Sequence, residues 1–191
     1  MLETDRLRLR QWIDADIEPF IALNQDKRVM RYFPNLYSEA ETRNMISLCQ
    51  KSIDENGWGF WAVDLKSTQE FIGMVGLNRI PDDIPLDDTL EVGWRLASPY
   101  WGKGYATEAA RASLDYAFTT LNSECVVAFT AKDNHPSRRV MERLGMKKRL
   151  EGFFHPRLEQ DHPLGEHVVY DITQSRFVET DYSKPDTTET V

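Results

Sequence analysis

Residues 98–110 read SPYWGKGYATEAA, and they place two glycines and a lysine directly before an alanine-rich segment. From Ala106 to Leu121 the chain has no glycine or proline, and its apolar residues recur at helical spacing. We therefore expect a tight glycine loop that leads into a helix. The first N–H groups of a helix lack intrahelical partners and lie at the positive end of its dipole, so they attract anions. The stretch predicts a phosphate-binding loop.

Length and composition favour one domain. The chain has 191 residues, of which 41% are hydrophobic, and this suffices for one well-formed core but is short for two. We expect a single domain over residues 1–175 and a polar, disordered tail over residues 176–191. The composition does not decide between a monomer and a homodimer.

Charge and cysteine content exclude several classes of protein. A net charge of −8 argues against a general nucleic-acid binder and is compatible with an amine-bearing substrate. No apolar run approaches the length of a membrane span, so we expect no membrane partner. Cys49 and Cys125 lack metal-type spacing and stand among apolar residues, which favours buried thiols in a reducing compartment. We expect a cytoplasmic protein.

The order of predicted elements is strand, two helices, three strands, helix, strand, helix and two strands. Helices return between only some neighbouring strands, which predicts an α/β fold of the α+β mixed kind. We expect a mixed, mostly antiparallel sheet of about seven strands with helices on both faces. The expected strands lie at residues 4–12, 58–65, 70–80, 89–97, 125–131, 146–154 and 166–173, and the expected helices begin near residues 14, 38, 106 and 134.

The glycine loop fits neither of two common nucleotide signatures. A Walker A loop requires Ser or Thr after Gly-Lys, but Gly104 follows Lys103, and the dinucleotide fingerprint requires a glycine where Thr107 stands. The loop instead resembles that of the GNAT superfamily of N-acetyltransferases, whose pattern is Gln/Arg-x-x-Gly-x-Gly/Ala before a helix. Residues 101–106 match this pattern at Gly104 and Ala106, and Trp101 stands in place of Gln or Arg.

A second motif strengthens the resemblance. Residues 134–146, NHPSRRVMERLGM, resemble the family's Asn-x-x-Ser segment that ends in Leu-Gly-Phe/Met. This segment is typical of the branch that contains the ribosomal-protein alanine N-acetyltransferases. The predicted element order is also that of the family, so the resemblance extends over roughly residues 2–173.

The resemblance implies acetyl-CoA as co-substrate and assigns residues to it. The strand before the loop would hydrogen-bond the pantetheine arm through its main chain, and the loop N–H groups would hold the pyrophosphate. Asn134 would hold the pantetheine amide and cap its helix, and the arginines that follow would reach the 3′-phosphate or form an ordinary solvated pair. The expected cofactor residues are Gly93, Trp94, Arg95, Leu96, Trp101, Gly102, Lys103, Gly104, Tyr105, Ala106, Thr107, Asn134, Ser137, Arg138 and Arg139.

The resemblance further implies direct attack of an amine on the thioester, which requires a base and an acid. Glu91 shares a strand face with Gly93 and Arg95 and is the candidate base, against the alternative of a solvated strand glutamate. Many members place a tyrosine on the last helix to protonate the thiolate, but Met141 occupies that position. Ser137 is the next candidate, against the alternative of ordinary helix-start chemistry.

The loop at residues 155–167 contains three histidines. No cysteine joins them and their spacing is typical of a loop, so we expect no metal site. The same loop borders the acceptor in relatives. We therefore expect His155 and His167 to contact the acceptor substrate.

Together these features predict an acetyl-CoA-dependent N-acetyltransferase. The acceptor would be a primary amine, either a protein N-terminus or a small molecule. The alternative is a CoA-binding sensor or structural protein that has kept the phosphate-binding loop and lost catalysis, as the absent tyrosine would suggest.

Overall fold

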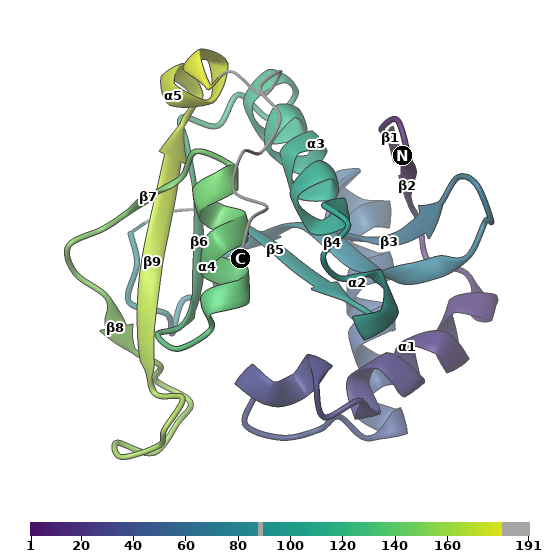
Figure 1. The fold of residues 1–191 in the computed structure, drawn as a ribbon, viewed down its shortest axis with the longest axis horizontal. Helices are drawn as coiled ribbons and strands as arrows, with labels where there is room; N and C mark the ends of the chain where they lie inside the picture. Colours follow the sequence, from purple (N-terminus) through teal and green to yellow (C-terminus); the bar gives the residue numbers. More distant parts are fainter. Residues whose placement is uncertain (88–89, 181–191) are drawn as a thin grey trace.

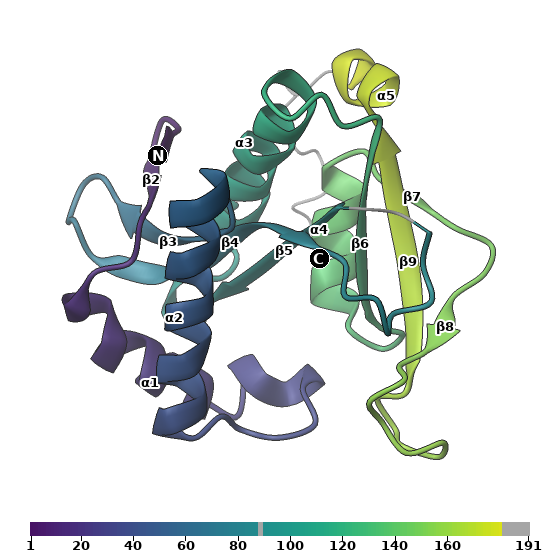
Figure 2. The same ribbon diagram turned by 180° about the vertical axis from the view of Figure 1, so that it is seen from behind.

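A computed structural model describes residues 1–87 and 90–180, which form one nine-stranded sheet with helices on both faces (Figures 1 and 2). The predicted fold class is confirmed. The sheet exceeds the expected seven strands because a short β1 precedes the first predicted strand and the strand predicted at 146–154 splits in two. The strands are β1 (Leu2–Glu3), β2 (Leu7–Arg10), β3 (Phe60–Leu65), β4 (Phe71–Arg79), β5 (Leu90–Leu96), β6 (Cys125–Ala131), β7 (Lys147–Lys148), β8 (Phe153–Phe154) and β9 (Glu166–Thr173), and the helices are α1 (Ile17–Gln25), α2 (Glu39–Asn56), α3 (Tyr105–Thr119), α4 (His135–Arg143) and α5 (Gln174–Glu179).

The sheet has one parallel contact, at its centre. Its order is β1-β2-β3-β4-β5-β6-β9-β7, with β8 also paired to β9, and every described pair except β5–β6 is antiparallel. Strands β5 and β6 share a single register pair, Glu91 with Val127. Because the two strands part beyond this pair, the sheet opens between its two halves.

Two hydrophobic cores cover the two faces of the sheet. Helix α3 packs on β4 and β5, and its Leu114 and Phe118 join Val92 and Leu96 in the larger core. Helices α1 and α2 cover the opposite face, nearest the viewer in Figure 2. The smaller core there contains these residues: Trp12, Phe20, Leu23, Val29, Met30, Ile46, Cys49, Ala62 and Met74.

The two cysteines differ in their surroundings. Cys49 is buried in the smaller core, and burial raises the pKa of its thiol to about 12. Cys125 is only partly buried, at the first residue of β6, although the sequence predicted burial for both. Neither residue forms a disulfide in the structure.

Local hydrogen bonds and backbone conformation define both ends of helix α2. The Ser38 hydroxyl accepts the backbone N–H of Glu41 at 3.2 Å, and the Glu41 carboxylate accepts the Ser38 N–H at 2.8 Å. These two bonds form a reciprocal capping box, and they begin the helix where the sequence predicts it, near residue 38. The helix ends at Gly57, whose φ of 81° lies in the left-handed region that favours glycine.

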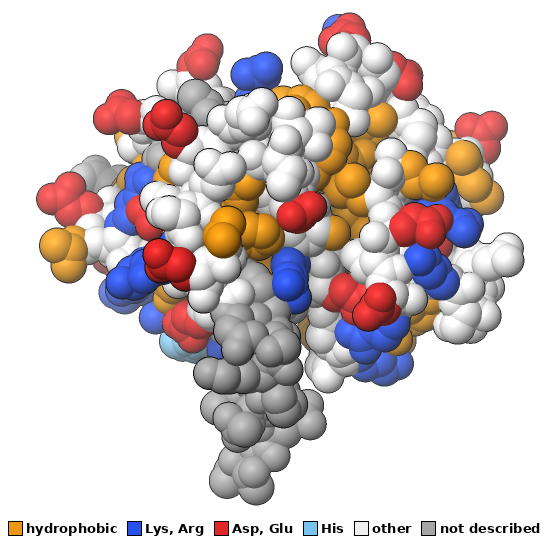
Figure 3. All heavy atoms as spheres, turned by 90° about the horizontal axis from the view of Figure 1, so that it is seen from above, with side chains coloured by type: hydrophobic (Ala, Val, Ile, Leu, Met, Phe, Trp, Pro, Cys, Tyr) orange, Lys and Arg blue, Asp and Glu red, His pale blue; other side chains and the backbone are white. Residues whose placement is uncertain are grey.

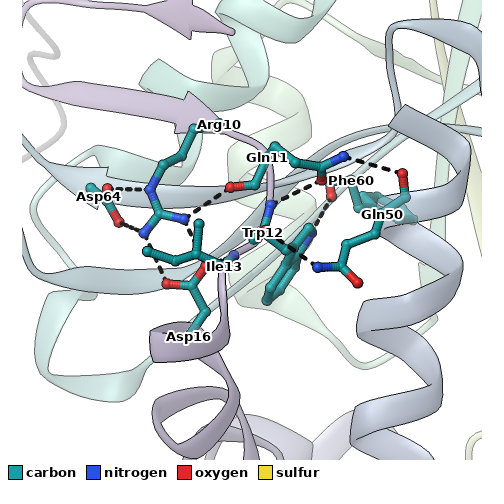
Figure 4. Close-up of polar contacts among 8 residues, drawn as sticks. All are labelled: Arg10, Gln11, Trp12, Ile13, Asp16, Gln50, Phe60 and Asp64. Carbon is teal, nitrogen blue, oxygen red and sulfur yellow. Dashed lines mark hydrogen bonds and ion pairs between the residues drawn. The ribbon is translucent and has the colours of Figure 1, made fainter. Parts of the chain in front are cut away.

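A buried ion-pair network fixes how the α1 layer meets the sheet (Figure 4). The Arg10 guanidinium, on β2, binds Asp16 at 2.6 Å and Asp64, on β3, also at 2.6 Å. These carboxylates raise the pKa of Arg10, with the hydrogen bond that Arg10 donates to Asp16 the largest cause and burial opposing it. Nearby, the Trp12 indole N–H donates to the Phe60 carbonyl at 2.8 Å. The network therefore ties β2, β3 and the start of α1 together.

Ordered structure continues past the predicted domain boundary at residue 175. Residues Gln174–Glu179 form α5, and its Phe177 ring lies 5.2 Å from that of Phe118 in the larger core. The predicted tail therefore does not begin at residue 176. The remainder of that prediction, at residues 181–191, lies outside the described residues.

The charged side chains are mixed on the face seen in Figure 3. Acidic and basic groups are interspersed there, with hydrophobic side chains exposed between them.

Within residues 1–87 and 90–180, no helix combines the length and the apolar character that crossing a bilayer requires.

Candidate active site

A deep cleft lies where β5 and β6 separate. Its volume is about 2100 Å³, which exceeds the roughly 300–1,000 Å³ of a typical ligand pocket and leaves room for two substrates. One wall is Val92–Leu96 of β5, and the other includes Phe129 and Thr130 of β6. The glycine loop and the first turns of α3 and α4 line one half of the cleft, while residues of α2, β3 and β4 line the other.

The glycine loop has the backbone geometry that the sequence predicts. Gly102 and Gly104 have φ angles of 73° and 78°, in the left-handed region where side chains are disfavoured. A Cβ at Gly102 would meet no atom within 4 Å, so conformation rather than space favours glycine there. Helix α3 begins directly after Gly104, which has no side chain to cap it. The first-turn N–H groups of Tyr105–Thr107 therefore remain available to an anion in the cleft.

Arg6 holds this loop in place. Its Nη1 donates to the Lys103 carbonyl at 2.9 Å, its guanidinium pairs with Glu108 at 2.6 Å, and it lies 4.7 Å from the centre of the Tyr105 ring. Burial alone would raise the pKa of Glu108, but hydrogen bonds from Thr4 and Arg6 outweigh burial and lower it. The sequence predicted Arg6 only as an exposed strand residue, because its partners are about 100 residues away.

Trp101 stands where the family pattern has a polar residue, and its side chain makes a hydrogen bond of its own. Its indole N–H donates to the carbonyl of Leu96, at the end of β5, at 2.8 Å. The side chain thus links the last residue of β5 to the start of the glycine loop. Trp101 itself remains 49% exposed and lines the cleft.

We expect Trp101→Phe to weaken acetyl-CoA binding by less than about tenfold. The substitution removes one partly buried hydrogen bond, which contributes about 1 kcal/mol, and keeps an aromatic ring. Calorimetric titration measures the affinity, with Trp58→Phe as a matched control away from the loop. An affinity loss of more than 100-fold would show that the indole contacts the cofactor directly.

Basic side chains gather along the loop half of the cleft, but Arg138 is not among them. Its Nε donates to the Tyr170 hydroxyl at 3.3 Å and its Nη1 to the Lys132 carbonyl at 3.0 Å, outside the cleft. Arg139 lines the cleft and Arg138 does not, because the helical turn directs neighbouring side chains differently, and contact of Arg138 with the cofactor stays a prediction. The basic residues that line the cleft near the loop are Arg6, Lys103, Arg111, Arg139 and Arg143.

Glu91 lies in the cleft and is not a solvated glutamate. It is partly buried, and its Oε1 accepts a hydrogen bond from the Asn78 side chain at 2.9 Å. Burial raises the pKa of Glu91 to about 7, and the opposing effects of Asn78 and Arg157 are smaller. A carboxyl with this pKa is half ionised near neutral pH, so it can accept a proton there.

Helix α4 presents Ser137 and Met141 to the cleft. The Asn134 side chain accepts the Ser137 N–H at 3.3 Å and donates to the Thr130 hydroxyl at 2.8 Å, so the predicted helix cap is confirmed. Ser137 is partly buried and lines the cleft. Met141 also lines it and is only 2% exposed. It has no group that can donate a proton to a thiolate.

The predicted acceptor histidines do not reach the cleft. Their rings lie 4.9 Å apart, and the His167 ring stacks at 5.4 Å on Phe153. The ring of Phe129, which does line the cleft, lies 6.4 Å from that of His167. Burial lowers the pKa of both His155 and His167. Neither histidine is among the residues that line the cleft, and their contact with the acceptor stays a prediction.

The histidine loop is tied to the loop before β5. The Arg157 guanidinium binds both carboxylate oxygens of Asp83, each at 2.7 Å.

In the part of the chain that the structure describes, no three His, Cys, Asp or Glu side chains are grouped so as to hold a metal ion.

Comparisons with known proteins agree with this geometry. The acetyltransferase (GNAT) domain family matches residues 6–147. YkkB of Bacillus subtilis (strain 168), an uncharacterized protein, is 37% identical over 146 residues, 76% of this chain and 84% of that protein. The FsC-acetyl coenzyme A-N(2)-transacetylase of Aspergillus fumigatus is 31% identical over 93% of this chain and 77% of that protein. The crystal structure of an acetyltransferase from Agrobacterium tumefaciens str. C58 gives a TM-score of 0.74 at 31% identity, covering 91% of this chain and 94% of that one.

Proposed function

This chain belongs to the GNAT acetyltransferase family, and from that premise we propose that it transfers the acetyl group of acetyl-CoA to a primary amine. The observation that carries the proposal is that one cleft contains both an anion-binding helix start and Glu91, whose pKa is about 7. The similarity to an acetyl coenzyme A-dependent transacetylase supports the choice of donor.

The main chain would supply most of the contacts to acetyl-CoA. The N–H groups of residues 103–107 would bind the pyrophosphate, at the positive end of α3. The edge of β5 beyond Glu91 lacks β6 as a partner, so its backbone groups can pair with the extended pantetheine arm as a neighbouring strand would. Bound there, acetyl-CoA supplies the activated acyl group.

Glu91 would accept the proton that the amine must lose before it attacks. The neutral nitrogen then forms a bond to the acetyl carbon, the bond from that carbon to sulfur breaks, and the thiolate leaves with the electron pair. Glu91 takes the proton directly or through a water molecule, since it lines the cleft on the side of α2. The nitrogen loses a second proton as the amide forms, and the thiolate takes up one proton through Ser137 or through water, so the products are the acetylated amine and CoA.

We expect Ser137→Ala to slow transfer by about two- to tenfold. A hydroxyl near the sulfur would help to protonate the leaving thiolate, but water can replace a single donor in an open cleft. Acetyl-CoA affinity should change little, because the Ser137 N–H, not its hydroxyl, donates the hydrogen bond to Asn134. Steady-state rates at saturating acetyl-CoA measure the effect. A loss above 1,000-fold would make Ser137 the essential acid, and unchanged turnover would remove it from the reaction.

Free-thiol release from acetyl-CoA, measured with and without a panel of amines, tests the proposed function. We expect release that depends on the amine and disappears in Gly104→Asp. A CoA-binding sensor would bind acetyl-CoA tightly and release no thiol with any amine.

The proposal also includes a cytoplasmic location, a monomeric or homodimeric state and kinship with ribosomal-protein alanine N-acetyltransferases.

A further inference from the structure

Arg95 is a buried cation in the lining of the cleft. It lies on β5, on the same face as Glu91 and Gly93, and is only 6% exposed. Its Nη1 donates to the Asn24 side-chain oxygen at 2.7 Å, and its guanidinium lies 4.2 Å from the centre of the Phe33 ring. The ring of Tyr37 lies on it at 5.1 Å. The side chain therefore enters the layer of α1 and α2.

This guanidinium lacks a counter-charge. Across residues 1–87 and 90–180, no carboxylate forms an ion pair with Arg95, and its Nε is buried without a hydrogen-bond partner. Burial lowers the pKa of Arg95, and the neighbouring Tyr37 opposes this shift. Arg10 shows the contrast, because that less buried arginine binds two carboxylates. Keeping a charge buried without a partner destabilises a fold, so Arg95 needs an explanation beyond packing.

The surroundings of Arg95 suit an anion that also has an apolar part. Met45 touches the guanidinium through its sulfur, at 3.8 Å from Nη1, which is a weak contact that a carboxylate oxygen would replace. Arg31, exposed at the same end of the cleft, adds a second positive charge. Glu91 is the one carboxylate among the described lining residues of this half: Val29, Arg31, Tyr32, Phe33, Met45, Phe60, Met74, Glu91, Gly93 and Arg95.

We propose that Arg95 binds a carboxylate of the acceptor, so that the acceptor is an amine that also carries a carboxylate group. This inference rests on the proposed function and specifies its second substrate. The acceptor's amine would lie toward Glu91 and its carboxylate toward Arg95, two positions beyond Gly93 on the same strand face. Both groups would then be paired with a side chain of opposite charge, which fixes the acceptor's orientation.

The test compares acceptors that differ only in charge. Acceptors are tested in sets of three compounds that have the same chain length and one primary amine. In each set, the other end of the compound is a carboxylate, the corresponding primary amide or a second ammonium group. The sets cover a range of amino acids and ω-amino acids. For the wild-type protein we expect the lowest acceptor KM for the carboxylate, about 10–100-fold below that of the amide, because hydrogen bonds to charged groups contribute about 1.5–3 kcal/mol. The diamine should be the poorest acceptor.

Two variants separate recognition from folding. In Arg95→Met the carboxylate and amide should give equal acceptor KM values, while the KM for acetyl-CoA stays within about twofold. Arg95→Lys should retain part of the preference, since it keeps the charge and loses the planar fork. The matched control is Arg8→Met, which changes an exposed arginine that pairs with Glu3 away from the cleft.

The possible outcomes distinguish a failure of the inference from a failure of the proposed function. Acetylation of amides and diamines as efficiently as carboxylates by the wild-type protein would overturn the inference and leave acetyl transfer intact, without needing any variant. A lower melting temperature for Arg95→Met with an unchanged carboxylate preference would show a purely structural role and also overturn it. Absence of acetylation of every amine, with acetyl-CoA still bound, would instead contradict the proposed function.

Discussion

Gly104→Asp is expected to weaken acetyl-CoA binding by at least about 100-fold while the protein remains folded. A carboxylate at this position would face the pyrophosphate at the start of α3, and two like charges about 4 Å apart near a protein surface repel by about 4 kcal/mol. The backbone can accept the change, since aspartate tolerates the left-handed conformation better than most residues. The added Cβ would lie 3.3 Å from the flexible end of Arg6, which can move.

Gly104→Asn is the matched control for this variant. Asparagine has nearly the shape of aspartate and tolerates the same backbone conformation, but it carries no charge. We expect it to weaken binding by about tenfold, which isolates the electrostatic part of the aspartate effect. Calorimetry gives the affinities and thermal unfolding establishes that each variant is folded. A folded aspartate variant with unchanged affinity would remove the phosphates from this loop.

Glu91→Gln is expected to lower kcat by about 100-fold or more above pH 7, because general-base catalysis contributes roughly 10²–10⁴-fold. Glutamine keeps the shape of the side chain and cannot accept the proton. Acetyl-CoA affinity should be preserved, since the proposed phosphate site, the glycine loop, lines the other half of the cleft. Wild-type kcat/KM should fall about tenfold per pH unit below the Glu91 pKa of about 7, and the variant should lose this acid limb. A full rate with an unchanged pH profile would assign the base to another group.

The same substitution has an effect on stability with a defined sign. The folded protein holds a proton on Glu91 more tightly than the unfolded chain, since burial raises its pKa from 4.5 to about 7. The free energy of unfolding therefore falls as pH rises through this window, by at most about 3 kcal/mol. Glu91→Gln should thus be more stable than wild type at pH 8 and similar to it at pH 4. Glu55→Gln, an exposed position on α2, is the control.

Local sequence signals predicted the parts of the fold that depend on neighbouring residues. The start of α2 near residue 38, the start of α3 directly after the glycine loop and the start of α4 at Asn134 all depend on chemistry within a few positions. For the same reason the glycine loop and the starts of α3 and α4, which line one half of the cleft, could be predicted from the sequence.

The acceptor half could not be predicted, because contacts distant in sequence build it. Arg95 was expected to contribute only its backbone to the cofactor, but its side chain is buried against Asn24 and Phe33, more than 60 positions earlier. The histidines were expected at the acceptor because of their loop, but Phe129 lines the cleft and His167, whose ring lies 6.4 Å from that of Phe129, does not. The sequence likewise did not show which side of α4 faces the cleft. Arg139 lines the cleft, whereas Arg138 bonds Tyr170 instead.

Mass spectrometry of one reaction mixture tests the central claim most directly. The full-length protein is incubated with acetyl-CoA and a mixed panel of amines, and acetylated amine, free CoA and the intact protein mass are measured together. We predict an acetylated amine and CoA in equal amounts, no acetyl group on the protein, and neither product with Gly104→Asp. Acetyl-CoA that stays bound and intact in the presence of every amine, or an acetyl group that accumulates on the protein, would contradict direct transfer.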